Sequence, residues 1–197
     1  MNYKVIIPPT EEPLTLDETK LHLRVDNMDE DDYISALITA AREQVEQITG
    51  RALLLQIIQQ KYTDFPRKSK EDYPAIRLLK SPVAEVSSIT YKVEELVDEV
   101  LTIVDAEMEA EDYIITSTEP AYIVPNVGTD FPSTNCEIEN VIVEYIAGYP
   151  TAADVPQSIK FAMLLLIGDL YENRQDGIRN LPRASQALLN PYRTNKY

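Results

Sequence analysis

Residues 31–50 read DDYISALITAAREQVEQITG, and this stretch is the clearest structural element that the sequence predicts. Asp31 and Asp32 stand near its amino-terminal end, where the helix dipole favours acidic side chains. Gly50 is typical of the residue that follows the last turn of a helix. The apolar residues recur at helical spacing: Ile34, Leu37, Ile38, Ala41, Val45 and Ile48. The stretch therefore predicts an amphipathic helix whose apolar face needs a packing partner.

A shorter helix is expected just before this one. Thr15 and Glu18 have the spacing of a capping box, in which each side chain bonds to the backbone amide of the other residue. This helix should end at about Arg24. Within the longer helix, Arg42 and Glu46 are one turn apart and should form an ion pair worth about 0.3 kcal/mol.

Two more helices are expected near the carboxyl-terminal end. Asp154 is a candidate cap for the first, and Pro156 is acceptable in a first turn. This helix should end between residues 174 and 177, and a last short helix should follow at 183–189. The first of the two has an apolar stripe: Ile159, Ala162, Met163, Leu166, Ile167 and Leu170.

Between the helical ends the pattern changes to short strands. Alternating or short apolar runs fall within 54–62, 76–79, 89–93, 100–104, 113–115, 122–124 and 141–146. Pro, Ser, Asn and Asp, which favour turns, separate these runs. Residues 53–147 are therefore expected to form six or seven short antiparallel strands.

The two helical ends should belong together. Neither pair of helices is long enough to bury its apolar stripe alone, so the simplest solution packs all four into one core. The predicted fold class is α+β. Residues 1–52 and 148–197 form a four-helix core, and residues 53–147 form an inserted antiparallel β module.

The charge of the chain is concentrated in one stretch. The formal net charge is -15, from 33 acidic and 18 basic residues. No Lys or Arg occurs between residues 93 and 159, and the rest of the chain is close to neutral. A surface of this sign repels phosphate backbones, which argues against DNA binding by this part of the chain. Two placements stay open: the acidic module could line a channel or lie on the outside.

Residue types that carry enzyme or metal chemistry are scarce. His22 is the only histidine and Cys136 the only cysteine, so no intrachain disulfide is possible. The acids at 29–32 lack the spacing of a calcium loop, and those at 107–112 would have to converge in a cleft to serve a hydrolase. We therefore predict no enzyme activity, no cofactor and no metal. Without an apolar run of membrane length or a signal-like start, a soluble intracellular protein is expected.

A set of short motifs at both ends carries a family resemblance. The motifs are Leu16-Asp17-Glu18-Thr19-Lys20-Leu21-His22-Leu23-Arg24, Thr49-Gly50-Arg51, Gly148-Tyr149-Pro150, Asp154-Val155-Pro156, Leu170-Tyr171-Glu172-Asn173-Arg174, Leu181-Pro182 and Leu188-Leu189-Asn190-Pro191-Tyr192-Arg193. Their order and spacing resemble the head–tail connector (adaptor, or head-completion) proteins of tailed phages and prophages. The β module matches only in layout, as the insertion seen in longer members.

The resemblance implies a structural virion protein without chemistry of its own. Such connectors form a ring below the portal, extend the DNA channel and join it to neck or tail components. The implied partners are further copies of the chain (a dodecameric ring on the portal), the portal protein and a neck or tail completion protein. DNA passes through without specific binding, and no membrane is involved. The implied location is the virion neck, after assembly in the host cytoplasm.

Five residues are candidates for the portal or subunit interface: Arg174, Leu188, Leu189, Tyr192 and Arg193. Arg174 could clamp a carboxylate of a neighbouring subunit, or it could simply satisfy the carboxyl-terminal end of its helix. The segment 181–197 could dock onto the portal or a neighbour. Alternatively, Leu188 and Leu189 cover the monomer's own core while the last residues fray.

Two functions of other classes compete with the connector hypothesis. An acidic protein could mimic DNA, or act as another intracellular protein-binding module, but this leaves the helical ends unexplained. A carboxylate-based metal hydrolase is the weaker alternative, because no convergent His or Gly-rich loop accompanies the acids.

Overall fold

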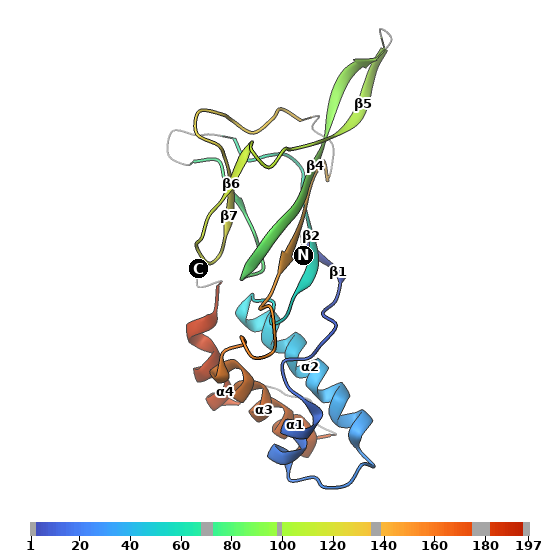
Figure 1. Cartoon of the computed structure of the whole chain (residues 1–197), viewed down its shortest axis with the longest axis vertical. Coiled ribbons are helices and arrows are strands. Elements are labelled where there is room, and N and C mark those ends of the chain that lie inside the picture. The colour runs from blue at the N-terminus through green and yellow to red at the C-terminus, as the bar shows by residue number, and fades with distance from the viewer. Residues whose placement is uncertain (1–2, 68–72, 98–99, 135–138, 175–181, 195–197) are drawn as a thin grey trace. The chain divides into compact units, whose positions relative to one another are not determined.

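The structure is a computed structural model that describes residues 3–67, 73–97, 100–134, 139–174 and 182–194 (Figure 1). The chain divides into two units. The helical unit comprises Pro9–Leu55 and Gly148–Tyr197, and the sheet unit comprises Met1–Pro8 and Gln56–Ala147. The helical unit begins at Pro9 and not at residue 1, because the first strand of the chain pairs within the sheet unit.

Four α-helices are found among the described residues of the helical unit, as predicted. They are α1 (Leu16–Leu23), α2 (Asp31–Thr49), α3 (Gln157–Glu172) and α4 (Arg183–Leu189), and a short 3-10 turn, η1 (Asn190–Tyr192), follows. Both predicted apolar stripes point inward. The fully or nearly fully buried core comprises Leu14, Ile34, Leu37, Ile38, Ala41, Val45, Leu53, Leu54, Val155, Ile159, Ala162, Met163, Leu166, Ile167 and Leu189.

The start of α1 is fixed by the predicted capping box. The backbone amide of Glu18 donates to Thr15 Oγ1 at 3.1 Å, and the amide of Thr15 donates to Glu18 Oε2 at 2.9 Å. The predicted cap of α3 is wrong. Pro156 occupies the cap position without a side-chain hydrogen bond, and Asp154 Oδ2 instead accepts from the amide and hydroxyl of Thr151.

The predicted pair of Arg42 and Glu46 is present, but it is buried. Arg42 Nη1 donates to Glu46 Oε2 at 3.3 Å, and Arg42 Nε donates to Glu12 Oε2 at 2.9 Å. The other oxygen of Glu46 accepts from the amide of Leu53 at 2.8 Å. The pair therefore joins α2 to the segments on either side of it, and loss of Arg42 would leave the buried carboxylate of Glu46 without this cation.

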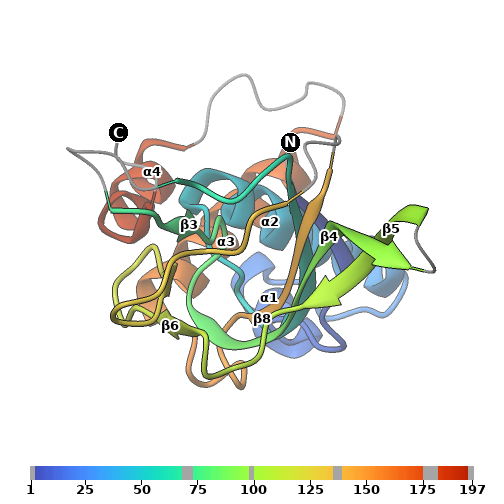
Figure 2. The same cartoon turned by 90° about the horizontal axis from the view of Figure 1, so that it is seen from above.

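The sheet unit contains eight strands among the described residues. They are β1 (Tyr3–Ile7), β2 (Gln56–Tyr62), β3 (Ile76–Arg77), β4 (Val83–Val97), β5 (Val100–Glu107), β6 (Tyr113–Ile115), β7 (Tyr122–Pro125) and β8 (Val141–Ala147). All pairings are antiparallel, in one sheet of order β1-β2-β8-β4-β5 and a second of order β3-β7-β6. Figure 2 shows the two sheets apart, with β3 and β6 on one side and β4, β5 and β8 on the other.

Seven of these strands fall where the sequence predicts them, and two features differ. The strand β1 lies in a segment that was assigned to the helical core, yet Tyr3 pairs with Gln60 and Val5 with Ile58 at the edge of the large sheet. The strand β4 has 15 residues, far more than the short strand expected at 89–93.

A buried polar network lies inside the sheet unit. Gln60 Oε1 accepts from the amide of Leu79 at 3.1 Å and from the hydroxyl of Tyr145 at 3.2 Å. The amide of Lys80 donates to the same hydroxyl at 3.2 Å, and Tyr62 donates to the carbonyl of Arg77 at 2.8 Å. Burial raises the pKa of Tyr62 to about 12 and also raises the pKa of Tyr145. The network thus satisfies the backbone of the segment that follows β3.

Candidate functional site

Arg51, from one of the motifs that carry the family resemblance, contacts residues of two others. Its Nε donates to the carbonyl oxygen of Tyr192 at 2.8 Å, and its Nη1 donates to the hydroxyl of Tyr149 at 3.3 Å. The guanidinium also lies 5.8 Å from the centre of the Tyr192 ring. Arg51 is 8% exposed, so these contacts are shielded from water. The carboxyl-terminal segment is therefore attached to the end of α2 within its own chain.

The other candidates in this segment also pack on the same chain. Leu189 is completely buried in the core of the helical unit, and Leu188 is half-buried against it. Arg193 Nε donates to the carbonyl of Ile48 at 3.3 Å, and the amide of Thr194 donates to the carbonyl of Thr49 at 2.8 Å. Of the predicted docking residues here, Arg193 is exposed and Tyr192 is half-buried. Residues 181 and 195–197 lie outside the described residues.

Arg174 forms a cluster with the start of α2. Its Nη2 donates to Glu30 Oε1, and the hydroxyl of Tyr171 donates to Glu30 Oε2. The guanidinium lies 4.6 Å from the ring centre of Tyr33 and 4.9 Å from that of Tyr171. Its Nε also donates to the carbonyl of Tyr171 at 3.4 Å, as expected of a cation at a helix end. The carboxylate that Arg174 clamps in this structure belongs to its own chain.

These contacts shift two ionisation equilibria. The hydrogen bond from Tyr171, and then that from Arg174, hold the pKa of the Glu30 carboxyl below its usual value. The same hydrogen bond raises the pKa of the Tyr171 hydroxyl. The cluster therefore favours an ionised Glu30 and a protonated Tyr171.

A projecting two-stranded ribbon was missed by the sequence reasoning. The strand β4 pairs with β8 only as far as Tyr91, whereas its pairing with β5 continues to Val97. Residues 92–97 and 100–105, here called the arm, therefore extend beyond the other strands of the sheet unit (Figure 1). The signal that could have revealed it is the pair of apolar residues Leu96 and Val97, followed closely by Val100 and Leu101, although Glu95 interrupts the alternation after Val93.

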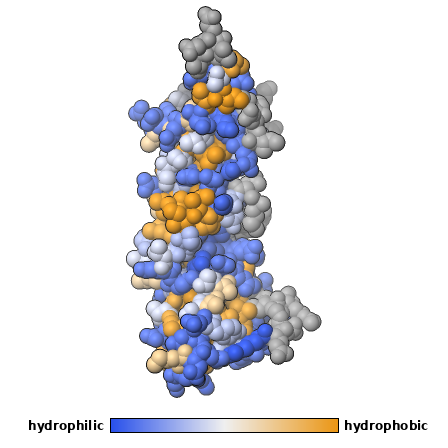
Figure 3. Space-filling view, turned by 90° about the vertical axis from the view of Figure 1, so that its right-hand side faces the viewer, coloured by the Kyte–Doolittle hydropathy of each residue, from blue (hydrophilic) through white to orange (hydrophobic). Residues whose placement is uncertain are grey.

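The arm exposes apolar side chains. Leu96 and Leu101 are opposite each other across the two strands and are 70% and 63% exposed. Ile103, 44% exposed, shares their face because it is two residues from Leu101. Figure 3 shows the resulting apolar surface near the top of the view, at the height of the β5 label in Figure 1. Glu94, opposite Ile103, and Glu95 are exposed too, so the arm is both apolar and acidic.

The helical unit has an exposed apolar surface of its own. Leu21 is 82% exposed and Phe161 is 53% exposed, and both line a pocket of ≈ 310 Å³. The ring of His22 meets Phe161 edge-on at 6.4 Å and also lines this pocket. Leu21 belongs to the motif quoted from the amino-terminal helix, but its exposure could not be read from that motif.

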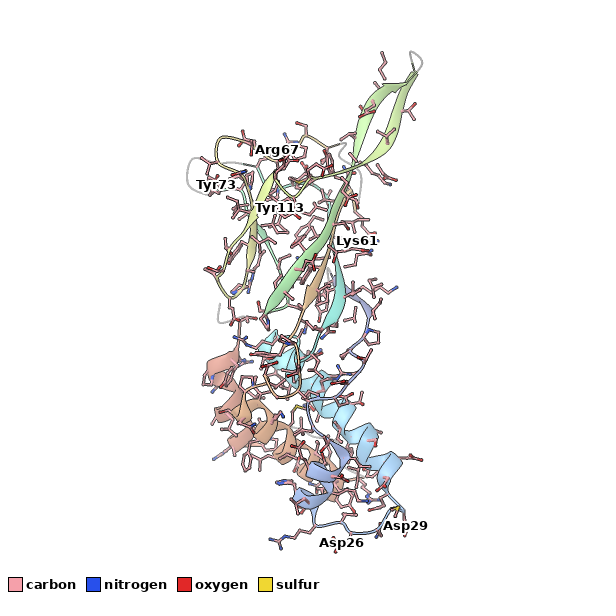
Figure 4. The ribbon with its side chains drawn as sticks, in the orientation of Figure 1. Asp26, Asp29, Lys61, Arg67, Tyr73 and Tyr113 are labelled. Carbon is pink, nitrogen blue, oxygen red and sulfur yellow. The ribbon has the colours of Figure 1, made fainter. Side chains whose placement is uncertain are left out.

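Acidic side chains do not converge in the described part of the chain. No group of three or more His, Cys, Asp or Glu that could hold a metal ion is found there. Asp26 and Asp29, labelled in Figure 4, lie on the loop between α1 and α2. Cys136 lies outside the described residues. Among the described residues, no helix has the length and apolar character needed to cross a membrane.

Comparison with known proteins identifies the class. A family model described as phage gp6-like head-tail connector protein matches residues 13–123, which is more than half of the chain. The chain belongs to this family, and the resemblance seen in the sequence is confirmed. The match includes α1, α2 and much of the sheet unit, whereas the carboxyl-terminal motifs lie beyond it. No curated protein sequence matches the chain.

Solved structures match the whole chain. One, titled as the neck of an empty GTA particle computed with C6 symmetry, has a TM-score of 0.77 at 20% identity and covers 100% of this chain and 97% of the other. The virion of a native gene transfer agent (GTA) particle gives 0.76 at 22% identity, with the same coverage. The neck of a native GTA particle computed with C12 symmetry gives 0.66 at 22% identity, again with the same coverage. At these identities the likeness shows the fold, and it confirms the predicted α+β class.

Proposed function

We propose that the chain is a structural neck protein that forms a ring below the portal and extends the DNA channel. The observation that carries the proposal is the fold match over the full chain to neck structures, two of which were computed with C6 and C12 symmetry. Family membership supports the same function. An acidic DNA mimic or a metal hydrolase would leave both findings unexplained.

The ring is dodecameric on the portal, and its subunits meet through two different surfaces. Head-to-tail contacts close a ring only if one patch of each subunit fits another patch of the next. The arm, with Leu96 and Leu101 exposed, is one such patch.

DNA passes through the ring without specific binding, and the acidic sheet unit lies on the outside. Two observations support this placement. The exposed acids of the arm stand beside exposed apolar side chains. Exposed apolar side chains are typical of a surface that binds another protein, and they do not suit the lining of a water-filled channel. An insertion is also tolerated best at a periphery. The protein performs no catalysis and needs no cofactor.

The portal protein and a neck or tail completion protein are the other proposed partners. Tyr192 and Arg193 remain the proposed portal contact in the carboxyl-terminal segment, because Arg193 is exposed. Deleting residues 181–197 would not test this contact. The deletion would remove Leu189 from the core and the hydrogen bond from Ser185 Oγ to the carbonyl of Ala162. Arg193→Glu is the better variant.

Negative-stain microscopy and light scattering on the full-length chain test the function. Rings in solution, or rings that assemble only when portal protein is added, are the expected result. Arg193→Glu should weaken portal binding without changing the helical circular dichroism. A wild-type chain that stays monomeric and never binds portal protein would exclude the connector function.

A further inference from the structure

The arm needs a protein partner. A two-stranded ribbon without further strands is only marginally stable in water. This one also carries Leu96, Leu101 and Ile103 on one face, all of them exposed. Contiguous apolar surface of this kind marks a site that another protein covers.

A groove at the opposite edge of the same sheet has complementary properties. The large sheet ends in β5 at one edge and in β1 at the other. Beside β1 lies a pocket of ≈ 620 Å³ whose lining includes Tyr3, Lys4, Lys61 and Tyr62. Lys4 is opposite Gln59, so Lys4 and Lys61 share one face of the sheet. Lys61 is labelled on β2 in Figure 4.

We propose that the arm of one copy docks into the groove between Tyr3, Lys4 and Lys61 of a second copy. The proposal rests on the ring function proposed above and specifies its subunit contact. Because the arm and the groove belong to opposite edges of one sheet, the contact is head-to-tail and can repeat around a ring. The leucines pack against the aliphatic stems of the two lysines, and the ammonium groups face Glu94, which shares the apolar face of the arm because it lies opposite Ile103.

Charge favours docking of the arm into the groove over a symmetric dimer in which two arms meet. The base-free stretch begins at Val93, so two arms placed together would bring Glu94 and Glu95 against their own copies. Like charges across paired strands are destabilising, which disfavours an arm-to-arm dimer. In the described part of the chain no acid pairs with Lys4, which leaves its charge for an incoming carboxylate.

The existing ion pair in the groove does not block the contact. Lys61 Nζ lies 2.6 Å from Glu139 Oε2, and the two side chains are 38% and 58% exposed. Exposed pairs of this kind contribute little to stability and rearrange easily. Burial of the apolar face drives the docking, and the charges set its orientation.

Two complementary variants test the contact. Leu96→Asp/Leu101→Asp disables the arm and leaves the groove intact, and Lys4→Glu/Lys61→Glu disables the groove and leaves the arm intact. Each variant alone should raise the subunit concentration needed for assembly by more than about tenfold. A one-to-one mixture should form heterodimers that grow no further, because only one intact arm and one intact groove can meet.

Matched controls separate docking from folding. Val127→Asp changes another exposed apolar residue of the sheet unit, and Arg183→Glu reverses an exposed base of the helical unit. Both should assemble like the wild type. Circular dichroism and thermal unfolding should show that all four variants are folded.

The outcomes are read by mass photometry in whichever condition, free or with portal protein, the wild type assembles. Rings formed by either complementary variant, or a mixture without heterodimers, overturn the docking proposal and leave the ring function standing. A wild type that assembles in neither condition overturns the ring function and this contact with it.

Discussion

Arg51 donates a hydrogen bond of 2.8 Å to the carbonyl oxygen of Tyr192, a residue 141 positions further along the chain. The contact fastens the carboxyl-terminal segment to the end of α2. With Tyr149 as its third member, the arrangement closes the helical unit through residues from three distant segments. The chemistry of this closure is a buried guanidinium that donates a charge-assisted hydrogen bond to a backbone carbonyl.

Replacing Arg51 with Ala should destabilise the helical unit by about 2 kcal/mol, because a part-buried, charge-assisted hydrogen bond to the carbonyl of Tyr192 is lost. Urea unfolding followed by circular dichroism measures the change. Arg183→Ala is the matched control, since Arg183 is exposed, and it should change stability by less than about 0.5 kcal/mol. Equal effects of the two substitutions would contradict the role assigned to Arg51.

Replacing Gly148 with Ala should cost more than about 2 kcal/mol. Gly148 has φ +129°, and an added Cβ would lie 2.1 Å from the carbonyl oxygen of Leu54. Gly128 is a matched control, because its φ is +87° but no atom lies within 4 Å of an added Cβ. Gly128→Ala should therefore cost only about 1 kcal/mol of backbone strain. Thermal unfolding of both variants checks the order, and a smaller loss for Gly148→Ala would refute it.

Glu30 should make the stability of the protein depend on acid pH. Its pKa is lowered in the folded state, so the unfolded chain binds more protons between the folded pKa and the ordinary value of 4.5. Its contribution is complete above that ordinary value and is lost as the pH falls through the folded pKa. Glu30→Gln should therefore lower the free energy of unfolding at neutral pH. The difference in this free energy between the variant and the wild type should become smaller in acid.

Urea unfolding from about pH 3 to about pH 7 measures this dependence. Glu172→Gln provides the control, because Glu172 is exposed at the end of the same helix that carries Tyr171. It should change the free energy of unfolding by less than about 0.5 kcal/mol. A Glu30→Gln curve that runs parallel to the wild-type curve would show that the Arg174 and Tyr171 contacts do not shift the ionisation of Glu30.

Replacing Tyr145 with Phe should destabilise the sheet unit by about 1–2 kcal/mol. The hydroxyl of Tyr145 accepts from the amide of Lys80 and donates to Gln60, and the side chain is fully buried. Phe would leave both partners without this hydrogen bond in a site that water does not reach. Tyr73→Phe, at an exposed position labelled in Figure 4, should have little effect. Hydrogen exchange at the amide of Lys80 should also accelerate in Tyr145→Phe, and unchanged exchange would argue against the network.

Local signals predicted much of this fold. The stripe of α2 repeats within one helix, and the capping box from Thr15 to Glu18 spans four residues, so neighbouring residues alone decide both. The cap of α3 failed for a related reason. Asp154 has the right residue type, but the turn with Thr151 competes for its carboxylate and wins.

Strand partners were beyond the reach of such local signals. The residues of β1 are apolar enough for a strand, but nothing near Tyr3 indicates that it pairs with Gln60. The length of β4 likewise depends on its partners, because pairing with β8 ends at Tyr91 whereas pairing with β5 continues to Val97. The arm was therefore not predicted from the sequence. Pairing registers are set by contacts between distant segments.

The interface candidates show the same division. Sequence alone determined the family, the helices at both ends of the chain, the series of strands between them and the acidic, base-free stretch. Each of these follows from neighbouring residues or from composition. Tertiary structure alone decided that Arg174 holds Glu30, 144 positions away, and that Leu189 belongs to the core. It also decided that Leu96 and Leu101 stand exposed on an arm. Burial and long-range pairing are properties of the packed chain, so the same residue types serve as core, clamp or docking surface according to what the fold brings against them.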